Sequence, residues 1–545
     1  MKNHLLTFCA SASFSLLVAC SGQPGEVKSY NEGINIIPMP QSLVQQQGAF
    51  RLSGSTSLGA ASPEAKTIAE FFAAKMRTAT GYDITVGESG NITLKLDESL
   101  DVNDEGYQLD VTGDAVNVTA KTPQGLFYGM QTFMQLLPAE IESAQKVSGI
   151  AWTAQAVSIK DEPRFGYRGI MLDPCRHFMP AENVKKFIDV LSLFKINRLH
   201  WHLTDDQGWR IEIKKYPKLT EIGSKRVEGE GTEHSGYYTQ EEIKDIVKYA
   251  ADHFITVVPE LELPGHEMAA IAAYPELSCK GEAGTPRVIW GVEDIVMCPG
   301  KEDMFKFLED VIDEMVPLFP SEYFHIGGDE CPKTSWKNCP LCQQRIRKEG
   351  LTADKNHSAE EKLQSYVIQR MEKYLATKGK KIIGWDEILE GGISEDCIVM
   401  NWRRPEFGKK ALKTNHRTIF TCSAWSYFNL KESRTQVEIG PRGPLPLEKV
   451  YGFQIVPDSL TAQQQKLVWG AQGCLWTEYI PTTWKAEFAV FPRMSALAEN
   501  VWSPLEKKNW ENFSRKVETQ YERYELWGAR YSEAFFRTQD VERKR

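Results

Sequence analysis

Two adjacent carboxylates, Asp329 and Glu330, follow Gly327-Gly328 at the end of a short apolar run. Cleaving a glycosidic bond needs a carboxyl that protonates the departing oxygen and a group that stabilises the positive sugar carbon. Neighbouring carboxylates repel each other, so the pKa of one rises and it can act as an acid near neutral pH. An isolated Asp-Glu pair would indicate a solvated loop or a helix N-cap. After two glycines on a strand-like run, it indicates a catalytic pair.

Further polar and aromatic side chains end other apolar runs. They are Asp173, the segment 200–206 (HWHLTDD), Glu260 and Glu262 before Pro264-Gly265-His266, Trp385-Asp386-Glu387, Trp402, Tyr427, and Trp476 with Glu478. Indole rings stack on the apolar faces of sugars, whereas hydroxyls need charged bidentate partners. This mixture therefore favours a carbohydrate over a phosphate or an apolar ligand.

The elements that must position these residues are eight short apolar or β-branched runs. They cover residues 167–173, 196–203, 255–262, 323–330, 381–387, 397–403, 417–425 and 467–476. Helical patterns separate them, for example Val184, Phe187, Ile188 and Leu191 at i, i+3, i+4 and i+7 spacing. Eight strands alternating with helices predict an α/β fold, a closed (β/α)8 TIM barrel, whose function lies at the carboxyl ends of the strands.

The rest of the chain predicts additions to this barrel. Residues 34–160 mix a hairpin around Thr112-Gly113-Asp114 with helices at 65–78 and 123–137, as in a small α+β support domain. The barrel is expected over 161–505, with a long proline-containing active-site loop between its last two strands. Residues 506–545 are expected to form a C-terminal helical extension, because aromatic and aliphatic residues recur there at helical spacing.

The start of the chain carries an export signal. Residues 5–19 form the only long apolar run, which is too short to span a bilayer. Its end, Leu17-Val18-Ala19-Cys20-Ser21, resembles the lipobox of bacterial lipoproteins. We expect a signal peptide over 1–20, a lipid anchor on Cys20, a polar tether over 21–33, and a place in the bacterial cell envelope, periplasmic or at the surface. An ordinary secretory peptide cut nearby is the alternative.

Charge and cysteine content add little. The 64 basic and 73 acidic residues give a net charge of −9 without a long basic run, which does not favour nucleic acid as a partner. An exported chain permits a disulfide, and Cys279 with Cys298 flank a loop that one could close. Cys339-Pro-Leu-Cys342 resembles half of a zinc ribbon, but no second half follows at the required spacing. We therefore expect no metal and no cofactor.

Five motifs, GGDE, HWHLTDDQGWR, PELELPGH, GWDE and LWTEY, resemble those of the family 20 glycoside hydrolases, the β-N-acetylhexosaminidases. The resemblance extends from Ile34 to the C-terminus. It implies retaining exo-hydrolysis of terminal, non-reducing β-linked N-acetylglucosamine (GlcNAc), and by extension N-acetylgalactosamine (GalNAc). In this mechanism the acetamido oxygen of the substrate attacks the anomeric carbon and forms an oxazolinium intermediate.

The same resemblance implies roles for single residues. Glu330 would be the general acid/base, Asp329 would orient the acetamido group, and Tyr427 would donate to its carbonyl, with Trp425 or Tyr451 as alternatives. The remaining residues expected to bind substrate are Arg168 at the 3- and 4-hydroxyls, Trp385, Trp402 and Trp476 around the acetamido group, and Glu478 at other hydroxyls. Arg168 could instead pair with Asp173 in the interior, and the tryptophans could be core.

Three residues resemble a relay behind the acid, in which His266 bridges Asp205 and Glu262 and tunes Glu330. A histidine that caps the Pro-Gly-His turn is the alternative. Asn429 stands where many relatives carry aspartate for the 4- and 6-hydroxyls, with Lys431 nearby. Replacing that acid with an amide near a cation would tolerate an anionic 6-substituent such as sulfate.

Two other functions remain open from the residues alone. His200 and His202 lie on one strand face, as in metal-dependent barrel hydrolases, and His266 and His325 could complete such a site. That function would leave the Asp-Glu pair and the tryptophans without a role. The second alternative is a sugar-binding lipoprotein that kept the fold and lost catalysis.

Overall fold

The computed structural model describes residues 34–535 except 230, 283 and 437–439. The expected signal peptide, the tether, the anchor cysteine Cys20 and the last ten residues lie outside the described residues. Among the helices that are described, none combines the length and the apolar character needed to cross a membrane.

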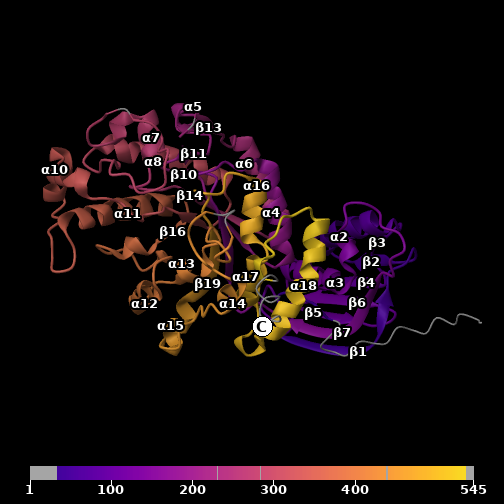
Figure 1. Cartoon of the computed structure of the whole chain (residues 1–545). Helices are drawn as coiled ribbons and strands as arrows, with labels where there is room; N and C mark the ends of the chain where they lie inside the picture. Colours follow the sequence, from indigo (N-terminus) through magenta and orange to yellow (C-terminus); the bar gives the residue numbers. More distant parts are fainter. Residues whose placement is uncertain (1–33, 230, 283, 437–439, 536–545) are drawn as a thin grey trace, which may run out of the picture. The chain divides into compact units, whose positions relative to one another are not determined.

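Eight parallel strands close into a barrel, in the order β14-β15-β16-β17-β18-β19-β8-β9 (Figure 1). They are β8 (Tyr167–Leu172), β9 (Arg198–His202), β14 (Thr256–Glu260), β15 (Tyr323–His325), β16 (Lys381–Trp385), β17 (Ile398–Asn401), β18 (Thr418–Phe420) and β19 (Val468–Leu475). Each strand lies within one of the eight predicted runs, so the predicted TIM barrel is confirmed. All carboxyl ends of a parallel barrel meet at one face, where the polar and aromatic side chains follow the strands.

Amphipathic helices cover the barrel. The longer ones are α4 (Ala181–Leu193), α6 (Gln240–Asp252), α8 (Glu302–Met315), α11 (Ala359–Thr377), α12 (Pro405–Lys413), α16 (Thr483–Val490) and α17 (Arg493–Trp502). Helix α6 begins at a capping box in which Thr239 and Glu242 satisfy each other's backbone N–H groups. Helix α8 buries Met304, Leu308 and Val311 along one stripe. Each such side chain contributes about 1.5–3 kcal/mol on burial, which holds the helix to the barrel.

A seven-stranded mixed sheet precedes the barrel, in the order β1-β7-β5-β6-β4-β2-β3. Its strands are β1 (Ser42–Arg51), β2 (Ser57–Ala60), β3 (Thr85–Gly87), β4 (Ile92–Leu96), β5 (Tyr107–Val111), β6 (Val116–Ala120) and β7 (Thr153–Asp161). Strands β5 and β6 form the predicted hairpin. The two predicted helices are α2 (Pro63–Thr80) and α3 (Pro123–Leu136), the latter capped by Thr122 through the backbone N–H of Gly125.

Buried ion pairs join this sheet domain to the amino ends of the barrel strands. The Nζ of Lys195 lies 3.3 Å from Oδ2 of Asp161, and neither side chain is exposed. The indole N–H of Trp502 donates to the same carboxylate at 3.0 Å. Helix α18 (Trp510–Leu526) is the predicted C-terminal helix, and its Arg523 pairs with Glu142 of the sheet domain at 3.3 Å (Figure 1).

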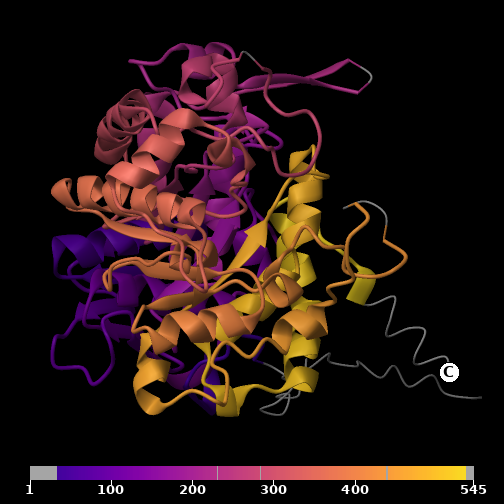
Figure 2. The ribbon, with the colours of Figure 1, turned by 90° about the vertical axis from the view of Figure 1, so that its left-hand side faces the viewer.

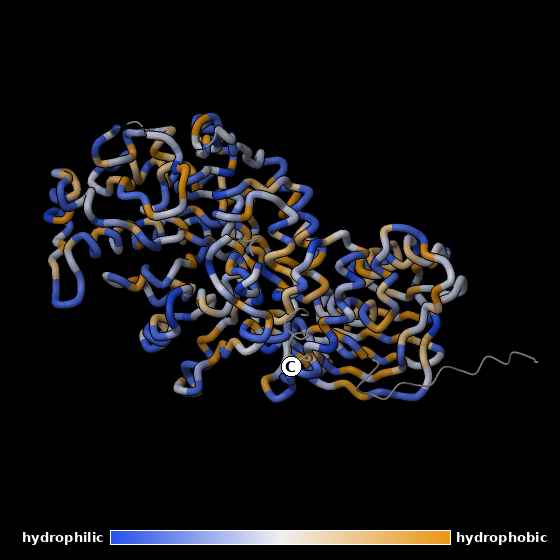
Figure 3. The backbone as a smooth tube through the Cα atoms, in the orientation of Figure 1, coloured by the Kyte–Doolittle hydropathy of each residue, from blue (hydrophilic) through white to orange (hydrophobic). Residues whose placement is uncertain are grey.

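Short elements lie in the connecting segments. They are β10 (Thr204–Asp205), β11 (Gly208–Trp209), β12 (Lys225–Glu228), β13 (Thr232–Ser235), α5 (Lys218–Glu221), α7 (Met268–Ala273), α9 (Thr334–Lys337), α10 (Pro340–Lys348), α13 (Ser423–Ser426), α14 (Leu447–Tyr451), α15 (Ala462–Leu467) and 3-10 turns at Ala139–Glu142, Pro275–Leu277, Val316–Leu318, Asp386–Leu389 and Leu505–Lys507. The β12–β13 hairpin projects from the other elements in Figure 2. In Figure 3 the hydrophobic stretches follow the interior strands, and many outer loops are hydrophilic.

The expected Cys279–Cys298 disulfide is wrong, because all nine cysteines of the described residues are free thiols. Both thiols instead lie beside Cys339 and Cys342, within one group of four sulfur atoms. No second closely spaced cysteine pair follows Cys342 in the sequence. The fold supplies that pair from an earlier segment.

Candidate active site

The bend after β15 brings the carboxyl groups of Asp329 and Glu330 close to the imidazole of His266. Gly327 and Gly328 have φ angles of +59° and +96°, and a Cβ on Gly327 would lie 1.7 Å from Oε2 of Glu262. Glycine is therefore required there for both conformation and space. Glu330 has a φ of +42°, a strained value for a residue with a side chain, which the surrounding structure must hold. As a result, Nε2 of His266 lies 3.7 Å from Oδ2 of Asp329 and 3.7 Å from Oε2 of Glu330.

His266 links the carboxylate pair to a second acidic pair. Its Nδ1 lies 3.1 Å from Oδ2 of Asp206 and 3.6 Å from Oδ1 of Asp205. Burial disfavours the charged imidazole, but the charge of Asp205 and the contacts with Asp206 and Glu330 outweigh it, so the pKa of His266 is raised well above its usual value. The structure thus brings Asp205, His266 and Glu330 together as expected. Asp206, which had no predicted role, contacts the same imidazole.

The two neighbouring carboxyls differ in pKa, and the raised one is Asp329. Burial and then the charge of Glu330 raise the pKa of Asp329 to about 6, although His266 opposes this. The pKa of Glu330 is lowered, because His266 favours its charged form more than burial disfavours it. The physical reason is exposure: the side chain of Asp329 is 12% exposed and that of Glu330 is 43% exposed. Glu330 can therefore become an acid only after its surroundings change.

Glu262 lies behind the bend rather than in the relay through His266. Its Oε2 accepts the N–H of Gly328 at 3.4 Å, and its Oε1 has no hydrogen-bond partner in the described structure. Burial and then the charge of Asp329 raise the pKa of Glu262 well above its usual value. Glu262 therefore supports the bend, and its expected bridge to His266 is replaced by Asp205 and Asp206.

The expected role of Arg168 is wrong. Its guanidinium is fully buried and lies 3.2 Å from Glu105 of the sheet domain, and it also donates to the carbonyl of Phe165. Position 168 is the second residue of strand β8, so it lies four residues, roughly 13 Å, from the carboxyl end of the strand. Arg168 thus joins the two domains. The alternative pairing with Asp173 is also not formed.

Arg176 lies at the mouth of the barrel. Its Nη1 lies 3.2 Å from Oδ2 of Asp173, and its Nη2 lies 2.7 Å from Oδ2 of Asp205. Its guanidinium carbon also lies 4.9 Å from the centre of the Trp476 ring. The spacing of Asp173 and Arg176, three residues apart after a strand, is the signal that could have identified it.

Glu478 belongs to the same corner as Arg176. Burial raises the pKa of Glu478, and the charge of Arg176 opposes this rise. Its Oε2 is buried without a hydrogen-bond partner within the described part of the chain. Asp205, in contrast, is 1% exposed and already contacts Arg176, His202 and His266, so it positions other groups and has no free side for a sugar.

Aromatic rings form the wall beside the carboxylates. Trp385 and Trp476 have ring centres 5.9 Å apart, and Tyr427 lies 6.1 Å from Trp476. Trp402 stacks on Tyr427 at 6.4 Å with an interplanar angle of 18°. These rings continue the apolar core inside the barrel, so they are both core and wall. The three expected tryptophans are thus brought to one place.

The two alternatives to Tyr427, namely Trp425 and Tyr451, do not belong to this wall. Trp425 stacks on Phe453 at 5.6 Å, and Tyr451 stacks on Phe513 at 4.5 Å. Only Tyr427 among the three joins the wall, and its backbone bridges Cys474 of β19. Of the three candidates, Tyr427 alone thus lies beside the tryptophans of the wall.

A further acidic residue, Glu387 of the GWDE motif, had no predicted role. Its Oε2 accepts the indole N–H of Trp402 at 3.0 Å. Burial and then the charge of Asp329 raise its pKa well above the usual value, so Glu387 belongs to the same electrostatic site. Asn429 follows Tyr427 and is 8% exposed, and its Oδ1 has no hydrogen-bond partner among the described residues.

The histidines of the expected metal-hydrolase alternative surround a carboxylate. Nε2 of His200 lies 3.0 Å from Oε2 of Glu260, Nδ1 of His325 lies 2.8 Å from Oε1, and Nδ1 of His202 also contacts Oε2. All of these side chains are fully buried. Trp385 donates to the same carboxylate at 2.9 Å. Glu260 therefore anchors the floor of the site, and His266 lies outside this group.

Comparison with known proteins agrees with this geometry. The catalytic-domain model of glycosyl hydrolase family 20 matches residues 165–505, and the model of its domain 2 matches residues 33–162. A β-hexosaminidase of Porphyromonas gingivalis is 48% identical over 97% of this chain and 68% of that protein.

Solved structures give the same result. A variant of the Streptomyces plicatus β-hexosaminidase in complex with its product GlcNAc has a TM-score of 0.82 at 30% identity, covering 92% of this chain and 97% of that chain. An exo-β-N-acetylglucosaminidase of Vibrio harveyi in complex with GlcNAc has a TM-score of 0.82 at 29% identity, covering 92% and 78%. The chain therefore belongs to glycosyl hydrolase family 20, the β-N-acetylhexosaminidase family of glycoside hydrolases.

Proposed function

We propose that this chain removes terminal, non-reducing β-linked GlcNAc, and also GalNAc, from glycans with retention of configuration. The observation that carries the proposal is the contact of one imidazole, His266, with both Asp329 and Glu330 at 3.7 Å beside a wall of indole rings. The relatives crystallised with GlcNAc support the choice of sugar.

The proposed reaction uses the substrate's own amide as nucleophile. The acetamido oxygen bonds to C1 while the bond from C1 to the departing oxygen breaks, and Glu330 gives that oxygen a proton. Asp329 accepts the N–H of the acetamido group and stabilises the positive oxazolinium ring. Water then attacks C1, Glu330 takes back a proton, and the amide is restored. No bond forms between enzyme and sugar.

The aromatic wall suits the acetamido group. Trp385, Trp402 and Trp476 enclose its methyl group, and the hydroxyl of Tyr427 donates to its carbonyl oxygen. The pKa of Asp329 is about 6, so its carboxyl is mostly charged at neutral pH. It must be charged to accept the N–H of the acetamido group and to stabilise the oxazolinium cation. Arg176 and Glu478 take the ring hydroxyls in place of Arg168.

The proton on Glu330 depends on the bound sugar. The free carboxyl has a lowered pKa and a half-exposed side chain. A sugar over this side chain removes water, and loss of water disfavours the charged form. The pKa of Glu330 therefore rises in the complex, at the moment when the proton is needed.

Two chromogenic substrates with the same leaving group test the proposal, a β-GlcNAc glycoside and the β-glucoside that lacks the acetamido group. We expect turnover of the first alone, with retained configuration in the first-formed product. Equal turnover of both, an inverted product or a trapped glycosyl ester would contradict it. Binding of GlcNAc without turnover would indicate the non-catalytic alternative, and loss of activity on chelation would indicate the metal hydrolase.

We also propose that the protein is anchored in the bacterial cell envelope by a lipid on Cys20. The short apolar run, the sequence Leu17-Val18-Ala19-Cys20 and the polar tether support this location. Replacement of Cys20 by serine should move the protein from the membrane fraction to the soluble fraction. Mass spectrometry of the mature N-terminus should find a diacylated cysteine, and an unmodified N-terminus would contradict the anchor.

A further inference from the structure

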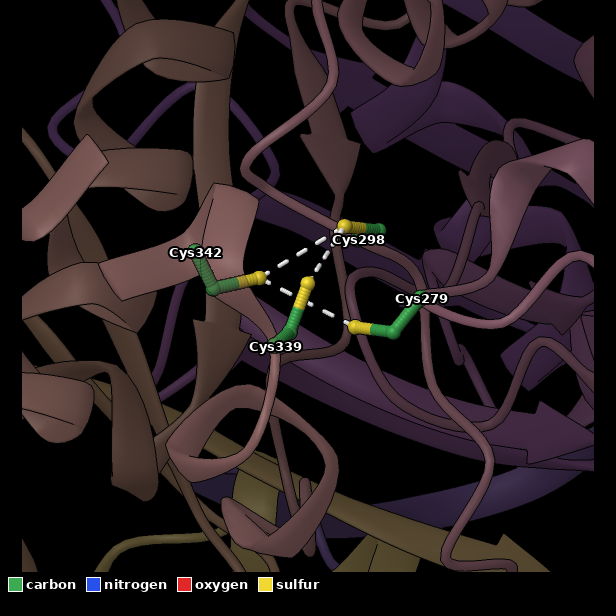
Figure 4. Close-up of side chains that lie close together, drawn as sticks. All are labelled: Cys279, Cys298, Cys339 and Cys342. Carbon is green, nitrogen blue, oxygen red and sulfur yellow. Dashed lines mark hydrogen bonds between the residues drawn. The ribbon is translucent and has the colours of Figure 1, made fainter. Parts of the chain in front are cut away.

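Four thiols converge beside the catalytic loop. They are Cys279, Cys298, Cys339 and Cys342, here called the cysteine tetrad (Figure 4). One pair flanks the loop between α7 and α8, and the other pair lies at the start of α10. Their sulfur atoms point toward one another in Figure 4.

The sulfur separations match a metal site. They are 3.8 Å between Cys279 and Cys342, 3.7 Å between Cys298 and Cys339, and 3.5 Å between Cys298 and Cys342. A tetrahedron with a zinc–sulfur bond of about 2.3 Å has sulfur–sulfur edges of about 3.8 Å. A disulfide would need about 2.05 Å.

We propose that the cysteine tetrad binds one Zn²⁺ ion as a closed tetrathiolate site. Four thiols lose four protons and form four sulfur–zinc bonds, with no change of oxidation state. Because sulfur fills all four positions, no position is open for water or substrate, so the ion is structural.

The surroundings favour a closed site of this kind. Cys298 and Cys342 are fully buried, and Cys339 is nearly so, among Val296, Trp336 and other apolar side chains. Cys339 stands at the N-cap position of α10, and the partial positive charge of the helix N-terminus stabilises thiolates.

The contacts of the tetrad tie it to the active site. The loop after β15 runs from Glu330 through Cys331 and Trp336, which belong to the same apolar cluster, to Cys339. Trp336 donates to the carbonyl of Met297 at 2.8 Å. In the other segment, the N–H of Arg287 donates to the carbonyl of Asp206 at 2.8 Å. A zinc ion would therefore fasten the catalytic loop to the loop that contacts Asp206.

Metal content of the purified full chain tests the proposal directly. We expect about one zinc per chain by elemental mass spectrometry, and thiols that alkylate only after denaturation with a chelator. Cobalt(II) exchanged into the site should give the intense visible bands of a tetrahedral thiolate complex. These measurements use the unaltered protein, so they do not depend on the folding of a variant.

Two variants provide the comparison. Cys342→Ser should lose the zinc, whereas Cys397→Ser, at a buried cysteine outside the tetrad, should keep it. Disulfides found among the four thiols by peptide mapping without reduction would overturn the proposal. So would four free thiols without stoichiometric metal, or iron in place of zinc. Each result is independent of hydrolytic activity.

Discussion

Nε2 of His266 lies 3.7 Å from Oε2 of Glu330, while its other nitrogen contacts Asp205 and Asp206. This cation favours the charged form of Glu330 and also opposes the rise in the pKa of Asp329. The pH dependence of the reaction is therefore set through one imidazole that lies 4% exposed behind both carboxyls.

Replacement of His266 by glutamine should move the pH profile upward. Loss of the cation raises the pKa of both carboxyls, so the acidic limb, where Asp329 must lose its proton, shifts to higher pH. The alkaline limb, where Glu330 must keep its proton, shifts in the same direction. We expect shifts of about one pH unit, in kcat/KM for the limb of Asp329 in the free enzyme and in kcat for the limb of Glu330 in the sugar complex. His234→Asn, on the projecting hairpin, is the control, and an unmoved profile in His266→Gln would contradict the assignment.

Replacement of Glu330 by glutamine should depress kcat by about 10²–10⁴-fold for substrates with poor leaving groups. Good leaving groups need little protonation, so the decrease in kcat should be much smaller for substrates that carry them. A series of aryl β-GlcNAc glycosides with graded leaving groups measures this dependence. Equal losses across the series would mean that Glu330 is not the proton donor.

Replacement of Asp329 by alanine should damage the step that the acetamido group performs. The amide would lose its orienting partner and the oxazolinium ring its counter-charge, so kcat should fall by about 10²–10³-fold. Asp329→Asn keeps the size of the side chain and tests the charge alone. Substrates with a fluorinated acetamido group, a weaker nucleophile, should react more slowly with the unaltered enzyme. A normal rate for Asp329→Ala would refute the role.

Variants of two arginines should distinguish an effect on catalysis from an effect on the stability of the fold. Arg176→Ala should lower kcat/KM, because Arg176 lies at the mouth beside Glu478. Arg168→Met should lower the free energy of unfolding by about 3–5 kcal/mol, because it removes the cation from a largely buried ion pair and leaves the carboxylate of Glu105 with only the amides of Gln124 and Asn197 as side-chain donors among the described residues. Folded Arg168→Met protein should keep its KM. Denaturant unfolding and steady-state kinetics of both variants check this, and a large rise in KM for Arg168→Met would contradict it.

The amide at position 429 should tolerate a 6-sulfated substrate. We expect comparable kcat/KM for plain and 6-sulfated β-GlcNAc glycosides, since Asn429 carries no charge to repel sulfate. Asn429→Asp should lower kcat/KM about tenfold for the sulfated substrate alone, because the new carboxylate would repel the sulfate. Complete rejection of the sulfated substrate by the unaltered enzyme would end this hypothesis.

Periodic patterns predicted the fold well. The eight barrel strands follow short apolar or β-branched runs, and the hairpin of the sheet domain follows alternating apolar and polar residues; a sequence shows both patterns directly. The bend before Asp329 could also be predicted, because Gly327-Gly328 is a local signal for positive φ angles, which residues with a side chain rarely adopt. These features depend on neighbours in the chain, so they needed no knowledge of the tertiary structure.

The sequence did not predict the roles that depend on a residue's position along its strand or on partners that are distant in the chain. Arg168 and Arg176 are eight positions apart around one strand, yet one faces the sheet domain and the other faces the mouth. The pairing of Cys279 and Cys298 with Cys339 and Cys342 joins separate loops. Sequence alone determined which chemical groups are present and which strands carry them. Tertiary structure decided which groups meet and which carboxyl is buried, because both depend on contacts and water exclusion between segments that are distant in the chain.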